Sequence, residues 1–176
     1  MKDAIDIALE NGFSHAAELN VDTIELNPEV RKMCAANTCH HYGKNWSCPP
    51  ACGTLDECGD RIKKYKKGII VQSTAQLEDS FDVEGMEELT KQHIKNYRST
   101  LAELKKKYPD VLYLGTGACD ICAECTYPDE PCRFPDKAIS SMEAYGMVVN
   151  EVCKANDLPY NYGKDTMTFV GCFLIG

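Results

Sequence analysis

The chain has 176 residues, of which 44% are hydrophobic and 26% are charged, as is ordinary for a soluble globular protein. Acidic residues outnumber basic ones by 27 to 19, so the net charge is −8. This balance argues against nucleic-acid binding, because neutralising phosphates requires a surplus of lysine and arginine. We expect one globular domain over residues 1–176 that binds no nucleic acid.

Predicted helices and strands alternate along the chain. A short amphipathic helix is expected near residues 4–9, with Gly12 as its stop, and a second helix begins at Pro28 and delivers Cys34 at its end. Further helices are predicted over residues 55–67, 82–107 and 137–155, the first ending before Gly68 and the last interrupted at Gly146. Strands are predicted near residues 21–26, 68–74, 111–116 and 166–175. The alternation predicts an α/β fold with one sheet of about four strands, in an order that the sequence does not reveal.

Cysteine is the most informative residue type, since the chain has 11 of them. The N-terminal segment lacks the continuous apolar core of a secretory signal, and no apolar run is long enough to span a membrane. We therefore expect a cytoplasmic protein without a membrane partner. Because reducing cytosol disfavours disulfides, metal ligation or redox chemistry is the expected use of these thiols.

The first cysteine-rich segment, from Cys34 to Cys58, is called the first district, and within it residues 40–50 are predicted to form a compact irregular loop with glycine and proline breakers. Five cysteines within 25 residues are hard to explain by packing, and we expect at least three to bind metal. Their spacing does not reveal which three. His40 and His41 are interpreted as loop residues, since adjacent histidines cannot easily face one metal. The candidate ligands of the first district are Cys34, Cys39, Cys48, Cys52 and Cys58.

The second district follows the strand predicted at 111–116, at the kind of position where open α/β sheets place ligands. Its candidate ligands are Cys119, Cys122, Cys125 and Cys132. The first three recur at two-residue intervals, close to the bacterial ferredoxin run C-x2-C-x2-C-x3-C-P, although the last gap here is longer. Cys153 and Cys172 fall in predicted regular elements and are interpreted as packed thiols.

The choice of metal rests on this spacing. A [4Fe–4S] cluster needs one thiolate per iron, and a C-x2-C-x2-C loop can supply three, whereas structural zinc usually takes two separated C-x2-C knuckles. We expect one or two [4Fe–4S] clusters, with zinc as the alternative. In two-cluster ferredoxins the distal cysteine ligates the other cluster, so Cys132 either belongs to its own district or completes a centre begun by Cys34, Cys39 and Cys48.

Three segments carry a family resemblance: residues 39–50, 117–135 and 141–147. Together they resemble a family of small cysteine-rich proteins, a domain of unknown function described as predicted metal-binding and common in anaerobes. The resemblance covers almost the whole chain. It implies metal binding by Cys34, Cys39, Cys48, Cys119, Cys122, Cys125 and Cys132. It implies no particular metal and no activity.

Three kinds of function are compatible with these patterns. The first is electron transfer or a redox accessory role, with an acidic surface that helps docking on a partner protein; no nucleotide-binding fingerprint is present. The second is an enzyme with an open cluster site, whose candidate residues are His40, Lys44, Trp46, Arg133, Glu143 and Tyr145. Of these, Lys44, Trp46 and Arg133 are the candidate cofactor-binding residues, since Lys44 and Arg133 can donate hydrogen bonds to cluster sulfurs. The third is a zinc-stabilised binding module.

Overall fold

A five-stranded mixed sheet lies at the centre of the computed structural model, which describes residues 1–176. In spatial order the strands are β1 (His15–Asn20), β2 (Lys67–Gln76), β5 (Thr166–Ile175), β3 (Val111–Gly115) and β4 (Ser140–Ser141). Neighbouring strands are antiparallel except β3 and β4, which are parallel. The strands predicted at 68–74, 111–116 and 166–175 are thereby confirmed, and the last of them is central.

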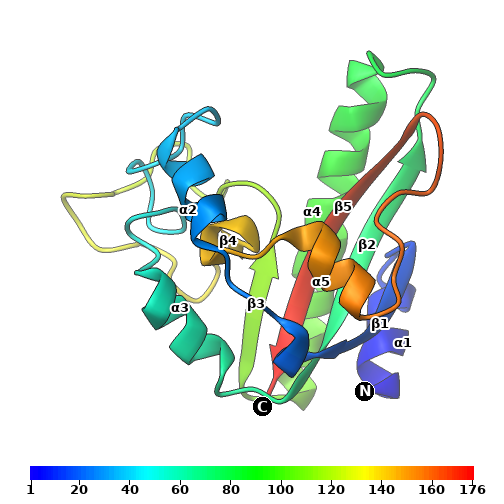
Figure 1. Ribbon diagram of the computed structural model, residues 1–176, viewed down its shortest axis with the longest axis horizontal. Coiled ribbons are helices and arrows are strands. Elements are labelled where there is room, and N and C mark those ends of the chain that lie inside the picture. The colour runs from blue at the N-terminus through cyan, green and yellow to red at the C-terminus, as the bar shows by residue number, and fades with distance from the viewer.

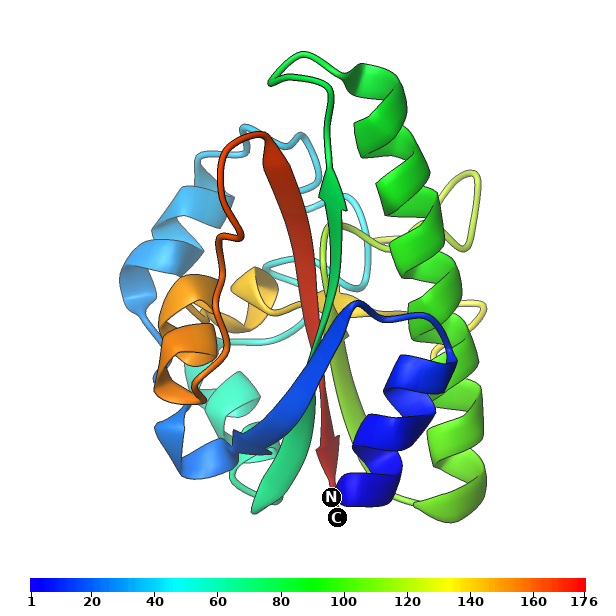
Figure 2. The same cartoon turned by 90° about the vertical axis from the view of Figure 1, so that its right-hand side faces the viewer.

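Helices lie on both sides of this sheet (Figure 1, Figure 2). One face carries α1 (Lys2–Glu10) and the long α4 (Val83–Lys107). The other carries α3 (Leu55–Ile62), α5 (Val149–Ala155) and the 3-10 turn η2 (Glu143–Tyr145), with α2 (Pro28–Ala35) packed outside η2. The predicted α/β class is confirmed, as one domain with helices covering both faces.

Burial on both faces explains the apolar sequences of the central strands. Along β2, Ile69 and Val71 pack toward α1 and α4, while Ile70 packs into the cluster beneath α3 and α5. In β5, Phe173 packs on the face covered by α1 and α4, and Leu174 packs on the face covered by α3 and α5. A strand covered on both sides reads as a continuous apolar run, which is why sequence alone located β2 and β5. No helix is long and apolar enough to cross a membrane.

The strand predicted at 21–26 is wrong. The first strand is β1, six residues earlier, and Val21–Thr23 forms the 3-10 turn η1. The Asn20 side chain accepts a hydrogen bond from the Asp22 amide at 3.1 Å, which turns the backbone out of the extended conformation. Ile24 and Leu26 still pack against the core, but from an irregular segment. Apolar and polar residues alternate over 21–26 because Ile24 and Leu26 both pack against the core, and not because the segment is a strand.

The helix predicted over 55–67 ends earlier than expected. It stops at Ile62, and Gly68 lies inside β2 instead of ending a helix. A Cβ on Gly68 would lie 2.4 Å from the backbone oxygen of Phe173 in β5. The glycine is therefore needed for the close approach of two central strands.

The segment predicted to be helical over 137–155 is helical only in α5. Before α5 the segment forms β4 and η2, and Gly146 ends η2 with a left-handed backbone, φ +87°. The predicted interruption at Gly146 is confirmed. A left-handed backbone at this position favours glycine, so the turn that carries Glu143 and Tyr145 past the first district is encoded locally.

We expect Gly68→Ala to destabilise the protein by about 3 kcal/mol, because the new methyl group would meet backbone that cannot move without breaking the sheet. Gly59→Ala is the matched control. Gly59 lies inside α3, where an added Cβ has only an ordinary contact at 3.5 Å with Leu26, so alanine should stabilise the helix by about 0.5–1 kcal/mol. Chemical unfolding of both variants measures the difference, and a neutral Gly68→Ala would contradict the close approach of β2 and β5.

Candidate metal centre

The second district occupies the long connection between β3 and β4. Strand β3 delivers the chain at Gly115, and the loop returns to the sheet at Ser140. All four of its cysteines are half-buried. They line one hollow together with Trp46 of the first district and Arg133. The structure thus brings the sulfur-bearing side chains of Cys119, Cys122, Cys125 and Cys132 around a common space.

The two districts lie side by side (Figure 1). Ser47 Oγ accepts a hydrogen bond from the Cys119 amide at 3.2 Å. The indole of Trp46 donates to the Glu130 carbonyl at 3.1 Å and stands edge-on to the Tyr127 ring, with 4.9 Å between centroids. These contacts join a loop after α2 to a loop after β3, so residues about 80 positions apart in the sequence form one site.

Three cysteines of the first district are grouped at this junction. Burial is the main cause that raises the pKa of Cys34 and of Cys48, and the nearby Cys39 thiol adds to both shifts. Cys119 also contributes to the shift at Cys48. Cys119 therefore lies next to the first district, and it lines the second-district hollow together with Cys132.

Cys52 and Cys58 form the inner part of the first district, and the Cys52 amide donates to the Cys48 carbonyl at 3.1 Å. Both are buried, Cys58 completely, in contact with the core cluster. Nη1 of Arg31 lies 3.7 Å from the sulfur of Cys52 and 3.9 Å from that of Cys58. A hydrogen bond from the Cys52 thiol, together with the guanidinium groups of Arg61 and Arg31, lowers the pKa of Cys58 to about 7. The pKa of Cys52 is raised by the same pairing.

Arg31 is the main site residue that sequence reasoning missed. Besides facing the two sulfurs, it donates to the Ala144 carbonyl at 2.5 Å and to the Gly53 carbonyl at 2.7 Å. It therefore ties α2, the first district and η2 together. A signal was available in its position one helical turn before Cys34, which places both side chains on one face of α2.

The remaining predicted residues are distributed around the two districts. Arg133 donates to the Glu124 carbonyl at 2.9 Å, which holds the second-district loop. Tyr145 is buried, and its hydroxyl accepts from Arg61 at 2.9 Å. Glu143 is half-buried, and its backbone carbonyl lies 4.0 Å from the Cys34 sulfur. The side chains at the surface are those of Lys44, His40 and His41. No three histidine, cysteine or carboxylate side chains converge closely enough to hold a single ion, so the four cysteines of the second district share the lining of a hollow without forming a preassembled metal site.

Cys153 and Cys172 are fully buried, as predicted for packed thiols. The Cys153 sulfur accepts a hydrogen bond from the Gln72 amide at 3.6 Å. Burial raises the pKa of Cys153 to about 11 and that of Cys172 to about 12. Both therefore remain neutral thiols at physiological pH, unlike a metal-binding cysteine, which is deprotonated.

A buried histidine on α4 was also not predicted from sequence. His93 is 2% exposed, its Nδ1 lies 3.0 Å from Ser73 Oγ, and its Nε2 has no hydrogen-bond partner. Burial lowers its pKa from the ordinary 6.5 to about 4. Helical spacing gave no signal, because a histidine on an apolar stripe looks like any other core position.

This histidine predicts acid sensitivity. Between pH 6.5 and about 4 the unfolded chain takes up a proton at His93 that the folded chain does not, so stability is lost as the pH falls through that range. The full loss is about 3 kcal/mol. In paired denaturant titrations, the free energy of unfolding of His93→Gln should fall by about 3 kcal/mol less than that of the wild type between neutral pH and pH 4. Equal losses in the two proteins would contradict a neutral buried imidazole.

The sheet, the paired cysteine loops and their shared hollow define a small cysteine-rich α/β protein with a candidate metal centre beside the sheet. Comparison with family models confirms the resemblance predicted from the sequence: the family described as predicted metal-binding protein (DUF2284) matches residues 17–175. The chain belongs to this family. No curated protein matched the chain, and neither did any solved structure.

Proposed function

We propose that this protein is an iron–sulfur protein that transfers electrons, or serves as a redox accessory, for an enzyme partner. The observation that carries the proposal is the grouping of Cys119, Cys122, Cys125 and Cys132 around one hollow. Four thiolates on a short loop, three of them at two-residue intervals, suit a [4Fe–4S] cluster, which would supply one-electron chemistry at this position.

The surroundings of the hollow fit such a role. Its cysteines are half-buried, so a bound centre would lie near the surface, within reach of a docked protein. Trp46 and Arg133 border the hollow and limit access of water, which is one of the factors that set a cluster's potential. The net charge of −8 favours docking on a basic partner surface.

A second centre in the first district is part of the proposal. Cys34, Cys39 and Cys48 are close enough together for their ionisations to interact, and Cys119 adjoins Cys48. We assign Cys52 and Cys58 a structural role rather than metal binding. The Arg31 guanidinium contacts both sulfurs and donates to the carbonyls of Ala144 and Gly53, so it already occupies the space beside the two thiols. We therefore place any second centre on the outer group.

Anaerobic purification tests the proposal. The protein should be brown, with a broad absorption near about 400 nm and matching amounts of iron and inorganic sulfide. About four irons per chain would indicate one cluster, and about eight would indicate two. A single-electron reduction monitored by electron paramagnetic resonance should accompany bleaching. Colourless protein that contains only zinc would overturn the iron–sulfur proposal and favour a zinc-stabilised module.

A further inference from the structure

The central strand β5 has a neighbour on one side only along half of its length. Strand β2 pairs with all ten residues from Thr166 to Ile175, whereas β3 pairs only with Cys172 to Ile175. Residues 166–171 therefore form an open edge, where the chain that leaves β3 turns away into the second district. Exposed sheet edges are normally shortened, charged or covered, because their free peptide groups pair readily with another chain.

The hydrogen-bond alternation shows which peptide groups are free. The Leu77 amide donates to the Asp165 carbonyl at 2.7 Å, and these two residues continue the register of β2 and β5. Because bonded and non-bonded pairs alternate along an antiparallel ladder, Asp165, Met167 and Phe169 face β2. Thr166, Thr168 and Val170 consequently face the open edge, but Val170 is only 4% exposed. The amides and carbonyls that a docking strand can reach are therefore those of Thr166 and Thr168. Neither residue has a partner there.

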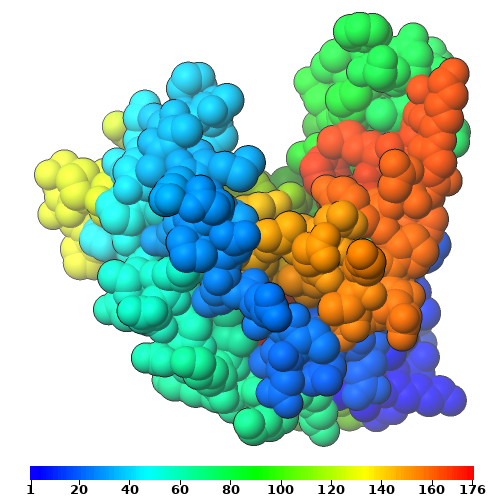
Figure 3. Space-filling model, in the orientation of Figure 1, coloured from blue at the N-terminus to red at the C-terminus, as the bar shows by residue number.

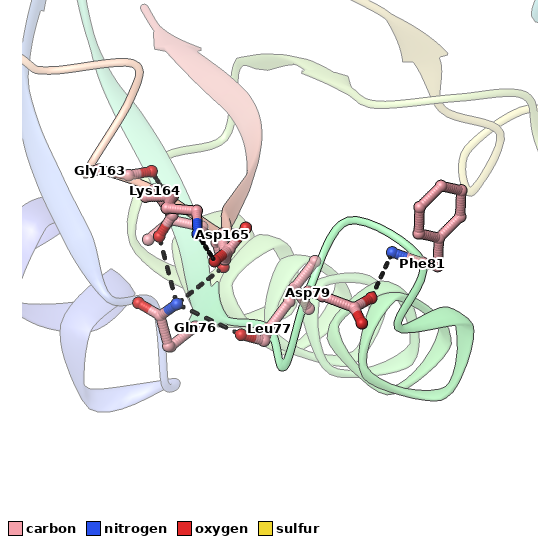
Figure 4. Close-up of polar contacts among 8 residues, drawn as sticks. Gln76, Leu77, Asp79, Phe81, Gly163, Lys164 and Asp165 are labelled. Atoms are coloured by element: carbon pink, nitrogen blue, oxygen red, sulfur yellow. Dashed lines mark hydrogen bonds and ion pairs between the residues drawn. The ribbon is translucent and has the colours of Figure 1, made fainter.

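Hydrogen bonds join the outer ends of β2 and β5, so the backbone along the open edge is ordered without a partner. The Gln76 side chain donates to the carbonyls of Lys164 and Asp165 at 3.2 and 3.1 Å, and Asp79 accepts from the Phe81 amide at 2.7 Å in the adjoining turn (Figure 4). Thr74 and Thr168 also share a hydroxyl hydrogen bond of 3.0 Å across the two strands. A docking segment would find this backbone already ordered.

Two hollows lie near the open edge, and Thr116 lines both, but only the first contains residues of β5. The first is a cleft of about 350 Å³, bordered by β5, Glu143, Val149 and Tyr160. Figure 3 shows it as the recess between the outer ends of β2 and β5 and the arm that contains α2, with residues of the 140s at its floor. The second lies under α4 and is bordered by His93 and by the ion pair of Arg98 with Asp120.

Every second side chain of an added strand would point into the first hollow, since successive residues of a strand point to opposite faces. The first hollow also favours a positively charged side chain from the docking segment. The Glu143 carboxylate is half-buried at its floor and has no ion pair or hydrogen bond. A lysine or arginine side chain reaching into the cleft would neutralise it.

We propose that an extended segment of a partner protein, carrying a basic side chain, adds to the open edge of β5 as a further strand and pairs with Glu143. Main-chain hydrogen bonds to Thr166 and Thr168 give affinity, and the cleft gives selectivity, as in other cases of strand addition. Thr116 lies three residues before Cys119, so the docked segment runs beside the second district. The inference holds whichever metal that district binds, because it rests on the sheet edge and Glu143.

The test uses random short peptides displayed on phage and selected on the anaerobically purified protein. Enriched peptides should carry lysine or arginine among β-forming residues, and their synthetic forms should slow hydrogen exchange at Thr166 and Thr168. Thr168→Pro removes the amide at the open edge without touching the ladder to β2, and should weaken binding about tenfold. Thr168→Val is the matched control, since it loses the same hydroxyl and keeps the amide. Glu143→Gln should weaken the basic peptides about threefold.

The proposal fails if no peptide is enriched, or if enriched peptides bind the proline variant as tightly as the valine variant. It also fails if size-exclusion chromatography shows a dimer that Thr168→Pro dissociates, because a second copy would then occupy the edge. Hydrogen exchange on the wild-type protein decides the matter even if the proline variant does not fold: unprotected Thr166 and Thr168 amides in the peptide complex overturn strand addition.

Discussion

Replacing Cys122 by alanine is expected to remove the metal of the second district and to destabilise the whole domain. The loop between β3 and β4 has no helix or strand of its own and is held by a few side-chain contacts, so a bound metal would add much of its order. Metal-binding free energy in such small domains is largely folding free energy. A loss of even about 4 kcal/mol would lower the melting temperature by about 10 °C in a chain of this size. Metal analysis and thermal unfolding under anaerobic conditions measure both effects.

Cys153→Ala is the matched control for that experiment. It makes the same chemical change at a cysteine that is fully buried in the core and hydrogen-bonded to Gln72. The control should keep its full metal content and lose only about 1–2 kcal/mol from the small cavity and the lost contact. If Cys122→Ala retained wild-type metal and stability, the assignment of the second district as the metal centre would be wrong.

Arg31→Met is expected to destabilise the protein by about 3 kcal/mol or more. The methionine keeps most of the side-chain volume but leaves the carbonyls of Ala144 and Gly53 without their donor, and each unsatisfied group costs about 1–3 kcal/mol. It also removes the cation beside the sulfurs of Cys52 and Cys58. Chemical unfolding measures the change in the free energy of unfolding.

Lys32→Met provides the comparison for Arg31→Met. Lys32 is the next residue on α2 and makes a single exposed ion pair with Glu29, so its loss should cost under about 0.5 kcal/mol. The contrast separates the contacts of Arg31 from any general effect of removing a positive charge from this helix. Similar values for the two variants would show that Arg31 does not hold η2 against the first district.

Arg31 also shows where prediction of the site from sequence stops. The two districts and their nine candidate cysteines were evident, because closely spaced thiols have few other uses in such a chain. The division into an outer group, Cys34, Cys39 and Cys48, and the inner pair, Cys52 and Cys58, was not evident, since it depends on which thiols are covered by the core and by Arg31. The contacts of Trp46 with Glu130 and Tyr127 are likewise long-range.

The sequence by itself determined the α/β class, the long helix α4, the buried strands β2 and β5 and the positions of the cysteine loops. Each of these has a local cause: helical periodicity, a continuous apolar run or a repeated cysteine interval. Only the tertiary structure decided that the first strand is 15–20 and that residues 21–23 form a 3-10 turn. It also showed that Gly68 permits a close approach of two strands, and that β5 is longer than β3 and so has an open edge. These features depend on the length and register of neighbouring strands, which no single segment encodes.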